Sequence, residues 1–183
     1  MKIQKAIKTV LCCLLLSIQP ALATVMSATT TNIAGNIWES RYTITNNTTS
    51  AIQWFTIYFK FDLYENFVYI PTAEVGAEWD VFAVEPFLSS DGFVDAFSFG
   101  EGIAVGQSLT NFVVRYNFLG QDLPGNQSFE VYNANDSVPT PVDSGEVDVK
   151  IVPEPAVILL FGVGLLALIS TRKYQRLLNT RRK

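Results

Sequence analysis

The sequence predicts an all-β fold, an antiparallel β-sandwich, between a hydrophobic segment at each end of the chain. Three observations predict it. Apolar residues in the central part recur at every second position, which is the period of strands with one buried face. Turn-forming glycine, proline, asparagine and aspartate interrupt these runs at short intervals. Aromatic residues make up 13% of the chain, which is enough to fill a core and excludes a disordered protein.

Two segments show the alternation most clearly. Residues 52–64 place phenylalanine, isoleucine and leucine on one face, and Trp54, Tyr58 and charged residues on the other; residues 110–119 alternate in the same way. A loop is predicted at residues 136–144, which contain two prolines. With roughly seven to nine short strands and no amphipathic helix, the pattern is that of a sandwich. The other predicted strands are 37–45, 67–70, 79–84, 93–99, 128–133 and 147–151.

Residues 38–47, and the turn at 103–108 before a long strand, resemble immunoglobulin-like and jelly-roll modules of bacterial surface proteins. The resemblance implies an immunoglobulin-like or jelly-roll-like sandwich for residues 24–151. It implies no activity, because these folds carry many unrelated functions.

The N-terminal segment has the three parts of a secretory signal peptide. Lysines precede an apolar run at residues 10–18, and Ala21 and Ala23 provide small residues at the −3 and −1 positions. We therefore expect residues 1–23 to be a helical signal peptide that is cleaved after Ala23. The run is shorter than the roughly 20 residues that span a bilayer, and a buried N-terminal helix is the alternative. Both cysteines, Cys12 and Cys13, lie in this run, so the mature chain would have no thiol.

The C-terminal segment predicts a transmembrane helix. Residues 156–171 are uncharged, and a helix of this length covers about 24 Å at about 1.5 Å per residue. Snorkelling basic side chains can make up the difference to a hydrocarbon core of about 30 Å. The basic tail, residues 172–183, places this end in the cytoplasm and the central domain on the other side. A helix buried in the domain is the alternative. The basic residues that set this topology are Arg172, Lys173, Arg181, Arg182 and Lys183.

Val152, Pro153, Glu154 and Pro155 stand directly before this run. Proline fixes its own φ and biases the preceding residue toward extended backbone, so residues 152–156 are predicted to be extended and accessible at the membrane surface. A plain loop before a helix is the alternative interpretation.

The Val-Pro-Glu-Pro box, the apolar segment and the basic end together resemble the PEP-CTERM sorting signal of proteins exported by Gram-negative bacteria. The resemblance covers residues 152–183. It implies processing by a membrane-embedded sorting protease, an exosortase, with Val152, Pro153, Glu154 and Pro155 as recognition positions. It also implies an organism that makes exopolysaccharide. The tail departs from the family pattern because it is longer than the usual basic end.

Charge and composition exclude several classes of function. Residues 24–152 carry a net charge of −12, whereas the segments before and after carry +3 and +5. An acidic domain lacks the clustered cations that bind nucleic acid. The chain has no histidine, which removes mechanisms that use a histidine base or ligand. We therefore predict a non-enzymatic exported protein, anchored in the inner membrane and then sorted to the cell surface or extracellular matrix.

A carbohydrate-binding module for an extracellular polysaccharide is the second hypothesis. Trp54 and Tyr58 fall on the same side of a predicted strand, beside Lys60 and Asp62, and sugars stack on exposed aromatic rings. The same pattern would suit rings that are buried against a neighbouring sheet.

The acidic residues suggest two further sites, and a solvated acidic surface is the alternative interpretation. A glycosidase needs two carboxyl groups beside the scissile bond, and the candidate sets are Glu74, Glu78 and Asp80, or Glu85, Asp91 and Asp95. A calcium ion needs only oxygen ligands, which Asp91, Asp95 and Glu101 could provide near predicted turns. The calcium-loop spacing is absent, and no other cofactor is predicted.

Overall fold

The computed structural model describes residues 23–125, 127–132 and 140–152 of the 183-residue chain. The predicted signal peptide and sorting segment therefore lie outside the described residues, except for Ala23 and Val152. The described residues contain ten strands: β1 (Val25–Ala34), β2 (Ile37–Thr45), β3 (Trp54–Phe59), β4 (Tyr64–Ile70), β5 (Trp79–Val84), β6 (Gly92–Ser98), β7 (Ser108–Phe118), β8 (Ser128–Tyr132), β9 (Pro141–Glu146) and β10 (Asp148–Val152).

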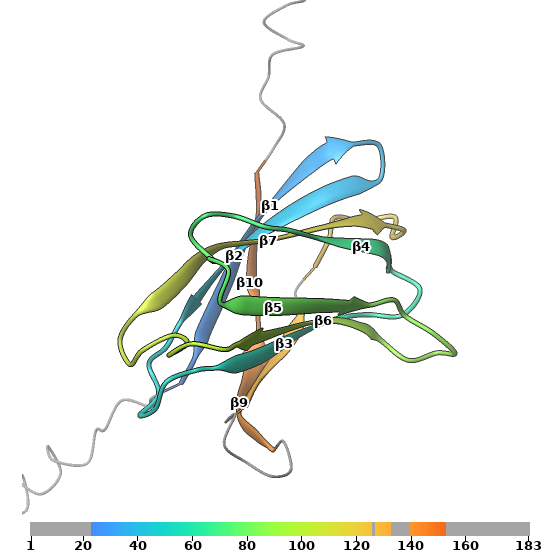
Figure 1. The fold of residues 1–183 in the computed structure, drawn as a ribbon. Coiled ribbons are helices and arrows are strands. Elements are labelled where there is room, and N and C mark those ends of the chain that lie inside the picture. The colour runs from blue at the N-terminus through green and yellow to red at the C-terminus, as the bar shows by residue number, and fades with distance from the viewer. Residues whose placement is uncertain (1–22, 126, 133–139, 153–183) are drawn as a thin grey trace, which may run out of the picture.

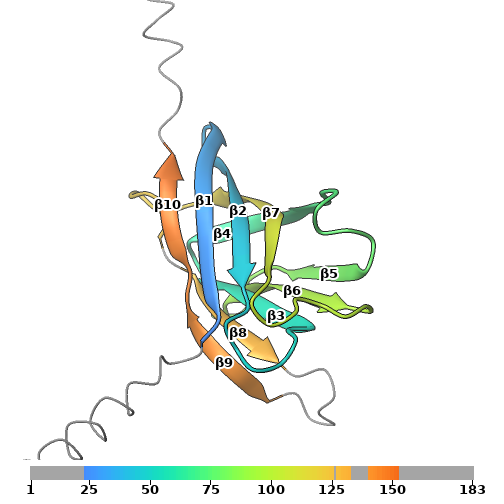
Figure 2. The same ribbon diagram turned by 90° about the vertical axis from the view of Figure 1, so that its left-hand side faces the viewer.

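The strands form two five-stranded sheets that pack face to face, as Figure 1 shows. The first sheet has the order β10-β1-β2-β7-β4, and the second has the order β5-β6-β3-β8-β9. The predicted all-β sandwich is confirmed. The sheets are antiparallel except at one edge, where β10 runs parallel to β1 (Figure 2).

Aromatic side chains from the inner faces of both sheets fill the core. Phe55 and Phe59 of β3 and Phe112 and Tyr116 of β7 are fully buried, as the alternating pattern predicts. The rings of Phe55 and Phe112 meet edge to face at 5.1 Å, and those of Phe59 and Tyr116 lie 5.6 Å apart. Burial of each such side chain stabilises the fold by about 1.5–3 kcal/mol. The residues that the structure describes contain no cysteine, so apolar packing and not a disulfide joins these two sheets.

The single strand predicted at residues 52–64 is wrong, because the structure divides it between the two sheets. β3 ends at Phe59, and the backbone N–H of Leu63 donates to the carbonyl of Lys60 (3.2 Å). Asp62 has a φ of 65°, which reverses the chain direction. Aspartate tolerates this left-handed conformation better than most residues. The turn carries the chain from β3 into β4 of the opposite sheet.

Two strands fall outside the sequence prediction. β1 was not predicted because its inward positions include Thr30, a polar residue that is fully buried and hydrogen-bonded to Ser40 (2.6 Å). β9 occupies the second half of the predicted loop and begins at Pro141. Because β9 is an edge strand and Pro141 is its first residue, the missing N–H of proline breaks no ladder.

Candidate functional site

The end of β10 and the sorting box are adjacent in the chain. Val152 is the last residue of β10, pairs with Thr31 of β1 and is 42% exposed. Pro153 follows immediately in the sequence, so no linker separates the folded domain from the box. Within the range that the structure describes, no helix could cross a membrane. The predicted helix at residues 156–171 lies outside that range, as do the other box residues and the basic tail.

β10 is an edge strand, and it pairs with β1 alone. Its five residues are exposed or half-buried, and only Val149 of these packs against the core. The residue before the strand, Val147, is fully buried and its N–H donates to the carbonyl of Gln127 (2.8 Å). Val147 is therefore the last fully buried residue before the box, and separation of β10 from β1 would remove only the contact of Val149 from the core.

The opposite boundary of the domain lies at Ala23 and Thr24. Ala23 is exposed, whereas Thr24 is buried and its backbone N–H donates to the Asp143 carboxylate of β9. Ala21 lies outside the described residues. In both views β1 begins at one end of the sandwich and β10 finishes at the other (Figures 1 and 2). The predicted signal cleavage position and the first residue of the sorting box are thus at opposite ends of the domain.

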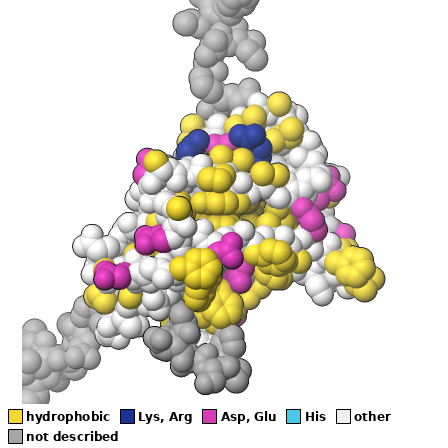
Figure 3. All heavy atoms as spheres, viewed as in Figure 1, with side chains coloured by type: hydrophobic (Ala, Val, Ile, Leu, Met, Phe, Trp, Pro, Cys, Tyr) yellow, Lys and Arg dark blue, Asp and Glu magenta, His cyan; other side chains and the backbone are white. Residues whose placement is uncertain are grey.

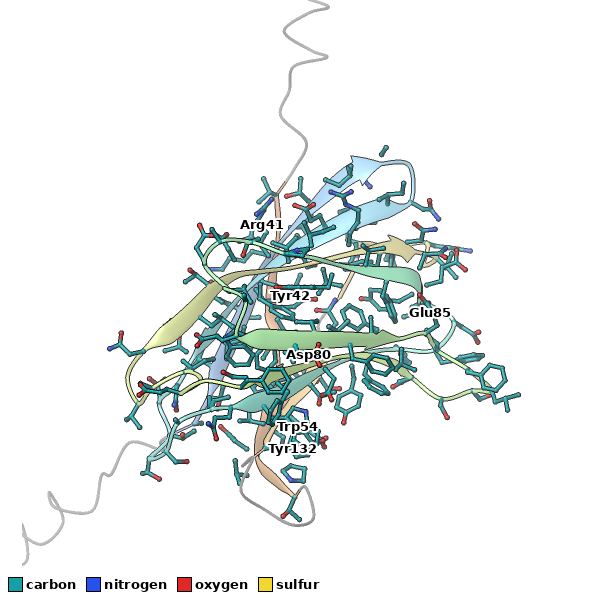
Figure 4. All side chains as sticks on the ribbon, in the orientation of Figure 1. Arg41, Tyr42, Trp54, Asp80, Glu85 and Tyr132 are labelled. Atoms are coloured by element: carbon teal, nitrogen blue, oxygen red, sulfur yellow. The ribbon has the colours of Figure 1, made fainter. Side chains whose placement is uncertain are left out.

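Trp54 and Tyr58 lie on the outer face of β3, where both are half-buried. The Trp54 indole stacks on Tyr132 of β8 with ring centroids 4.6 Å apart, and its N–H donates to Asp95 of β6 (2.6 Å). Figure 4 shows Trp54 and Tyr132 together below β3. Phe97 of β6 packs edge to face with the indole, with ring centroids 6.3 Å apart. Neighbouring rings of the same sheet therefore hold Trp54 in place outside the core.

The Tyr58 and Tyr132 hydroxyls converge on one carboxylate. Tyr58 donates to Glu130 (2.6 Å), Tyr132 also donates to Glu130, and the two hydroxyl oxygens lie 3.3 Å apart. Desolvation by burial raises the pKa of both tyrosines, and their hydrogen bonds to Glu130 raise it further. Both hydroxyls therefore remain protonated donors at neutral pH. The arrangement fixes a carboxylate among rings on an outer sheet face.

Other outward aromatic residues belong to the same face but were not chosen from the sequence. Their signal was present, because the alternation in residues 79–84, 93–99 and 128–133 already separates inward from outward positions. The sequence does not reveal which strands are neighbours, and therefore does not reveal which rings meet. The additional rings are Phe82, Phe93, Phe97, Phe99 and Tyr132.

Two of the acidic candidates accept hydrogen bonds from backbone N–H groups. Glu85, labelled in Figure 4, accepts from the N–H groups of Asn66 (2.8 Å) and Phe67 (2.7 Å), and Asp91 accepts from that of Phe61 (2.7 Å). Glu85 thus supports the irregular part of β4, and Asp91 supports the turn after β3. Over the described part of the chain, no three acidic, histidine or cysteine residues gather closely enough to hold a metal ion. Asp91, Asp95 and Glu101 therefore do not form one site there.

Comparison with protein families places a PEP-CTERM protein-sorting motif at residues 152–173. A search of curated proteins finds no match. The chain has low similarity to three solved structures. A GH20 exo-β-N-acetylglucosaminidase from Vibrio harveyi is 12% identical over 70% of this chain, with a TM-score of 0.38, and the chain spans only 18% of that enzyme's length.

The other two structures are cohesin modules. One, from a family 33 glycoside hydrolase of Clostridium perfringens, is 11% identical and is covered in full by 72% of this chain, with a TM-score of 0.39. The other, CaCohA2 of Clostridium acetobutylicum, is 10% identical, with 70% of this chain covering 91% of it and a TM-score of 0.34. Likenesses of this size carry no argument about function.

Proposed function

We propose that this chain, which carries a PEP-CTERM sorting motif, is a non-enzymatic protein of the cell surface or extracellular matrix, processed by an exosortase-type membrane protease. The motif match at residues 152–173 carries the proposal. The order of the box, the apolar run and the basic tail supports it, as does the acidic domain between basic ends.

The proposed route assigns a role to each segment. Residues 1–23 direct export and are removed after Ala23. Residues 156–171 then hold the chain in the inner membrane, with Arg172 and Lys173 on the cytoplasmic side. The exosortase reads Val152, Pro153, Glu154 and Pro155. Because Val152 is the last residue of a strand, the sandwich would stand directly beside the bilayer when the protease reaches the box.

Intact mass and fractionation of a tagged full chain test this route. We expect a species that begins at Thr24 and is recovered outside the cytoplasm, and we expect Glu154→Ala to stop C-terminal processing because it removes the only acid of the box. Glu146→Ala, which changes an exposed acid of β9, is the matched control and should be processed normally. A chain that stays in the cytosol with residues 1–23 attached would contradict the proposal.

Carbohydrate binding is the second candidate, as part of an association with exopolysaccharide. One observation favours it: Trp54 and Tyr58 lie on an outer face beside Tyr132 rather than in the core. The test is retention of the folded chain on a glycan array. Trp54→Ala or Tyr58→Ala should abolish retention while the circular dichroism spectrum stays unchanged. If both variants are retained like the parent chain, these rings do not bind glycan.

A further inference from the structure

The outer face of the sheet β5-β6-β3-β8-β9 carries a continuous row of four aromatic rings. Phe99 meets Phe97 edge to face at 5.4 Å, Phe97 meets Trp54 at 6.3 Å, and Trp54 stacks on Tyr132 at 4.6 Å. Phe97, Trp54 and Tyr132 come from the neighbouring strands β6, β3 and β8, and Phe99 follows directly after β6, so the row runs across three strands of the sheet. A row of this kind suits an extended polymer better than a single small molecule.

Carboxylates lie in the next register position beside this row. Phe82, Asp95, Thr56 and Glu130 pair in order across β5, β6, β3 and β8, and Asp95 accepts from both Trp54 and Thr56. Asp80 is exposed next to Phe97. In Figure 3 hydrophobic and acidic atoms lie together over the lower strands of this face. The face thus offers ring surface together with hydrogen-bond acceptors of negative charge.

The charge on this sheet has one sign. Its five strands, as the structure describes them, contain no lysine or arginine. Arg41, Arg115 and Lys150 lie in the opposite sheet, and Lys60 lies in the turn after β3. An acidic face without cations repels anionic polymers and favours partners that donate hydrogen bonds or carry positive charge.

We propose that this ring-and-carboxylate face binds a glycan chain that is uncharged or bears free amines, and rejects glycans rich in uronic acids. This rests on the carbohydrate-binding candidate above and adds the charge class of the ligand and further contact residues. The C–H faces of the sugars pack on the rings, and hydroxyl and ammonium groups donate to Asp80, Asp95 and Glu130.

Charge also disfavours other occupants of this face. A second copy docked through the same face would bring like carboxylates together. An anionic lipid surface would be repelled for the same reason. A basic peptide would satisfy the carboxylates, but it would not need a row of rings across three strands. The glycan is therefore the occupant that uses both features.

The rings divide into those that are packed and those that are free. Trp54 and Tyr132 cover one face of each other, so they fix the spacing of the row and leave only part of their surface open. Phe82 and Phe99 are 64% and 74% exposed, and they offer most of the free ring area. We expect these two side chains to make the largest apolar contacts with the sugar chain.

The experiment measures binding of the detergent-solubilised full chain to three hexasaccharides by calorimetric titration. The neutral probe is chitohexaose, the cationic probe is the same chain without its acetyl groups, and the anionic probe is hexagalacturonate. We expect binding of the first two and none of the third. The cationic probe should bind at least about fivefold more tightly at low salt, and this advantage should shrink at high salt because ions screen exposed charges.

Two variants and their controls separate ring contacts from charge. Phe82→Ala should weaken both bound probes roughly threefold or more, whereas Val68→Ala, which changes an exposed apolar residue of the opposite sheet, should not. Asp80→Lys should remove the preference for the amine probe and leave chitohexaose binding nearly unchanged. Asp148→Lys makes the same charge change on β10 and should have no effect.

The results distinguish the charge preference from carbohydrate binding itself. Binding of hexagalacturonate, or equal binding of the two chitin-derived probes at low salt, would overturn the charge assignment while carbohydrate binding itself stands. Binding of polylysine without binding of chitohexaose would show an acidic surface that is not a glycan site. If no probe binds and polylysine does not bind, both this inference and the carbohydrate-binding candidate fail, whereas export and sorting are unaffected.

Discussion

Asp143 provides a prepared acceptor for the N-terminus that signal cleavage would create. The backbone nitrogen of Thr24 donates to one oxygen of Asp143, and the other oxygen accepts from the N–H of Ser144 (2.9 Å). In the uncleaved chain this nitrogen is an amide. After cleavage following Ala23 it becomes an ammonium group, so the bond gains a second charged partner and the Coulombic attraction of an ion pair.

We therefore expect Asp143→Asn to destabilise the mature chain more than the precursor. The cost should be about 1–2 kcal/mol for a chain that begins at Thr24, and clearly less for the same chain with a Gly-Ser extension before Thr24. Urea unfolding of the four proteins measures the difference. Equal losses in the extended and unextended chains would mean that the ammonium charge contributes nothing to folding.

Ionisation of Tyr64 is expected to lower the stability of the fold at alkaline pH. It is 4% exposed, and its burial, with a smaller contribution from Tyr116, raises its pKa from 10.0 to about 12. The raised value means that the folded state keeps the proton longer than the unfolded state. The stability contribution is therefore complete below pH 10 and is lost as pH rises toward about 12.

The free energy of unfolding in urea, measured from neutral pH to about pH 12, gives this dependence. Tyr64→Phe should make the alkaline decline shallower by about 1–2 kcal/mol over that window, because one titrating group is removed. Its stability at neutral pH should change little, since the hydrogen bond of the hydroxyl to the carbonyl of Gly125 is long (3.4 Å). Parallel curves for the variant and the parent chain would refute this assignment.

At the scale of elements, the turn between β6 and β7 depends on one close backbone contact. Gly102 has a φ of 69°, and a Cβ there would lie 2.2 Å from the carbonyl oxygen of Ile52. That carbonyl accepts from the N–H of Ile103 (2.8 Å), which ties the turn to the segment before β3. A side chain at this position must displace the bridge between the two segments.

Gly102→Ala should therefore destabilise the fold by several kcal/mol, because backbone strain and steric overlap add. Gly106 provides the matched control, since it has a φ of 76° but no atom within 4 Å of an added Cβ. Gly106→Ala should cost only about 1 kcal/mol, the strain of the left-handed conformation. Thermal unfolding compares the two variants. Similar losses would show that conformation, and not contact with Ile52, sets the requirement for glycine.

Hydrophobic periodicity predicted β2 and β5 with their observed bounds, because apolar residues outnumber polar ones at their inward positions, even though Ser40 of β2 is buried. It failed where a polar residue faces the core, as Thr30 does in β1, because a buried hydroxyl that is paired with Ser40 leaves no apolar signal. It also failed at β9, where proline at the first position of an edge strand resembles a loop. Both failures have the same cause. A polar residue or a proline is tolerated in a strand where the folded structure accommodates it, and the sequence does not show those tertiary contacts.

The candidate surfaces could likewise be predicted only where a single segment carries the signal. Trp54 and Tyr58 could be chosen from alternation within one strand, and the structure places both on an outer face. Their partners could not be chosen, because contact with Tyr132, Asp95 and Glu130 depends on β3 lying between β6 and β8. The sorting box, in contrast, is a contiguous sequence signal, and the motif match needs no knowledge of the fold.

For the whole molecule, the fold and the sorting signal compete for Val152. The residue closes β10 through its pairing with Thr31, and it is also the first residue of the matched motif. A protease binds its substrate in extended form on both sides of the reading site, so recognition that includes Val152 requires at least the last pair of the β1–β10 ladder to open. The residues of β10 are exposed or half-buried, so opening this pair costs little free energy.

A flexible Gly-Ser insertion between Ile151 and Val152 should therefore speed processing, since it frees Val152 from the strand and keeps the box intact. The same Gly-Ser insertion after Gln121, in the exposed segment that follows β7, is the control and should leave the rate unchanged. A disulfide formed by Thr29→Cys with Lys150→Cys, two paired and exposed positions, should slow processing, and reduction should restore it. The measurement is the fraction of processed chain over time by intact mass. If the insertion and the disulfide both leave the rate unchanged, the protease reads only residues beyond β10, and strand opening is not part of sorting.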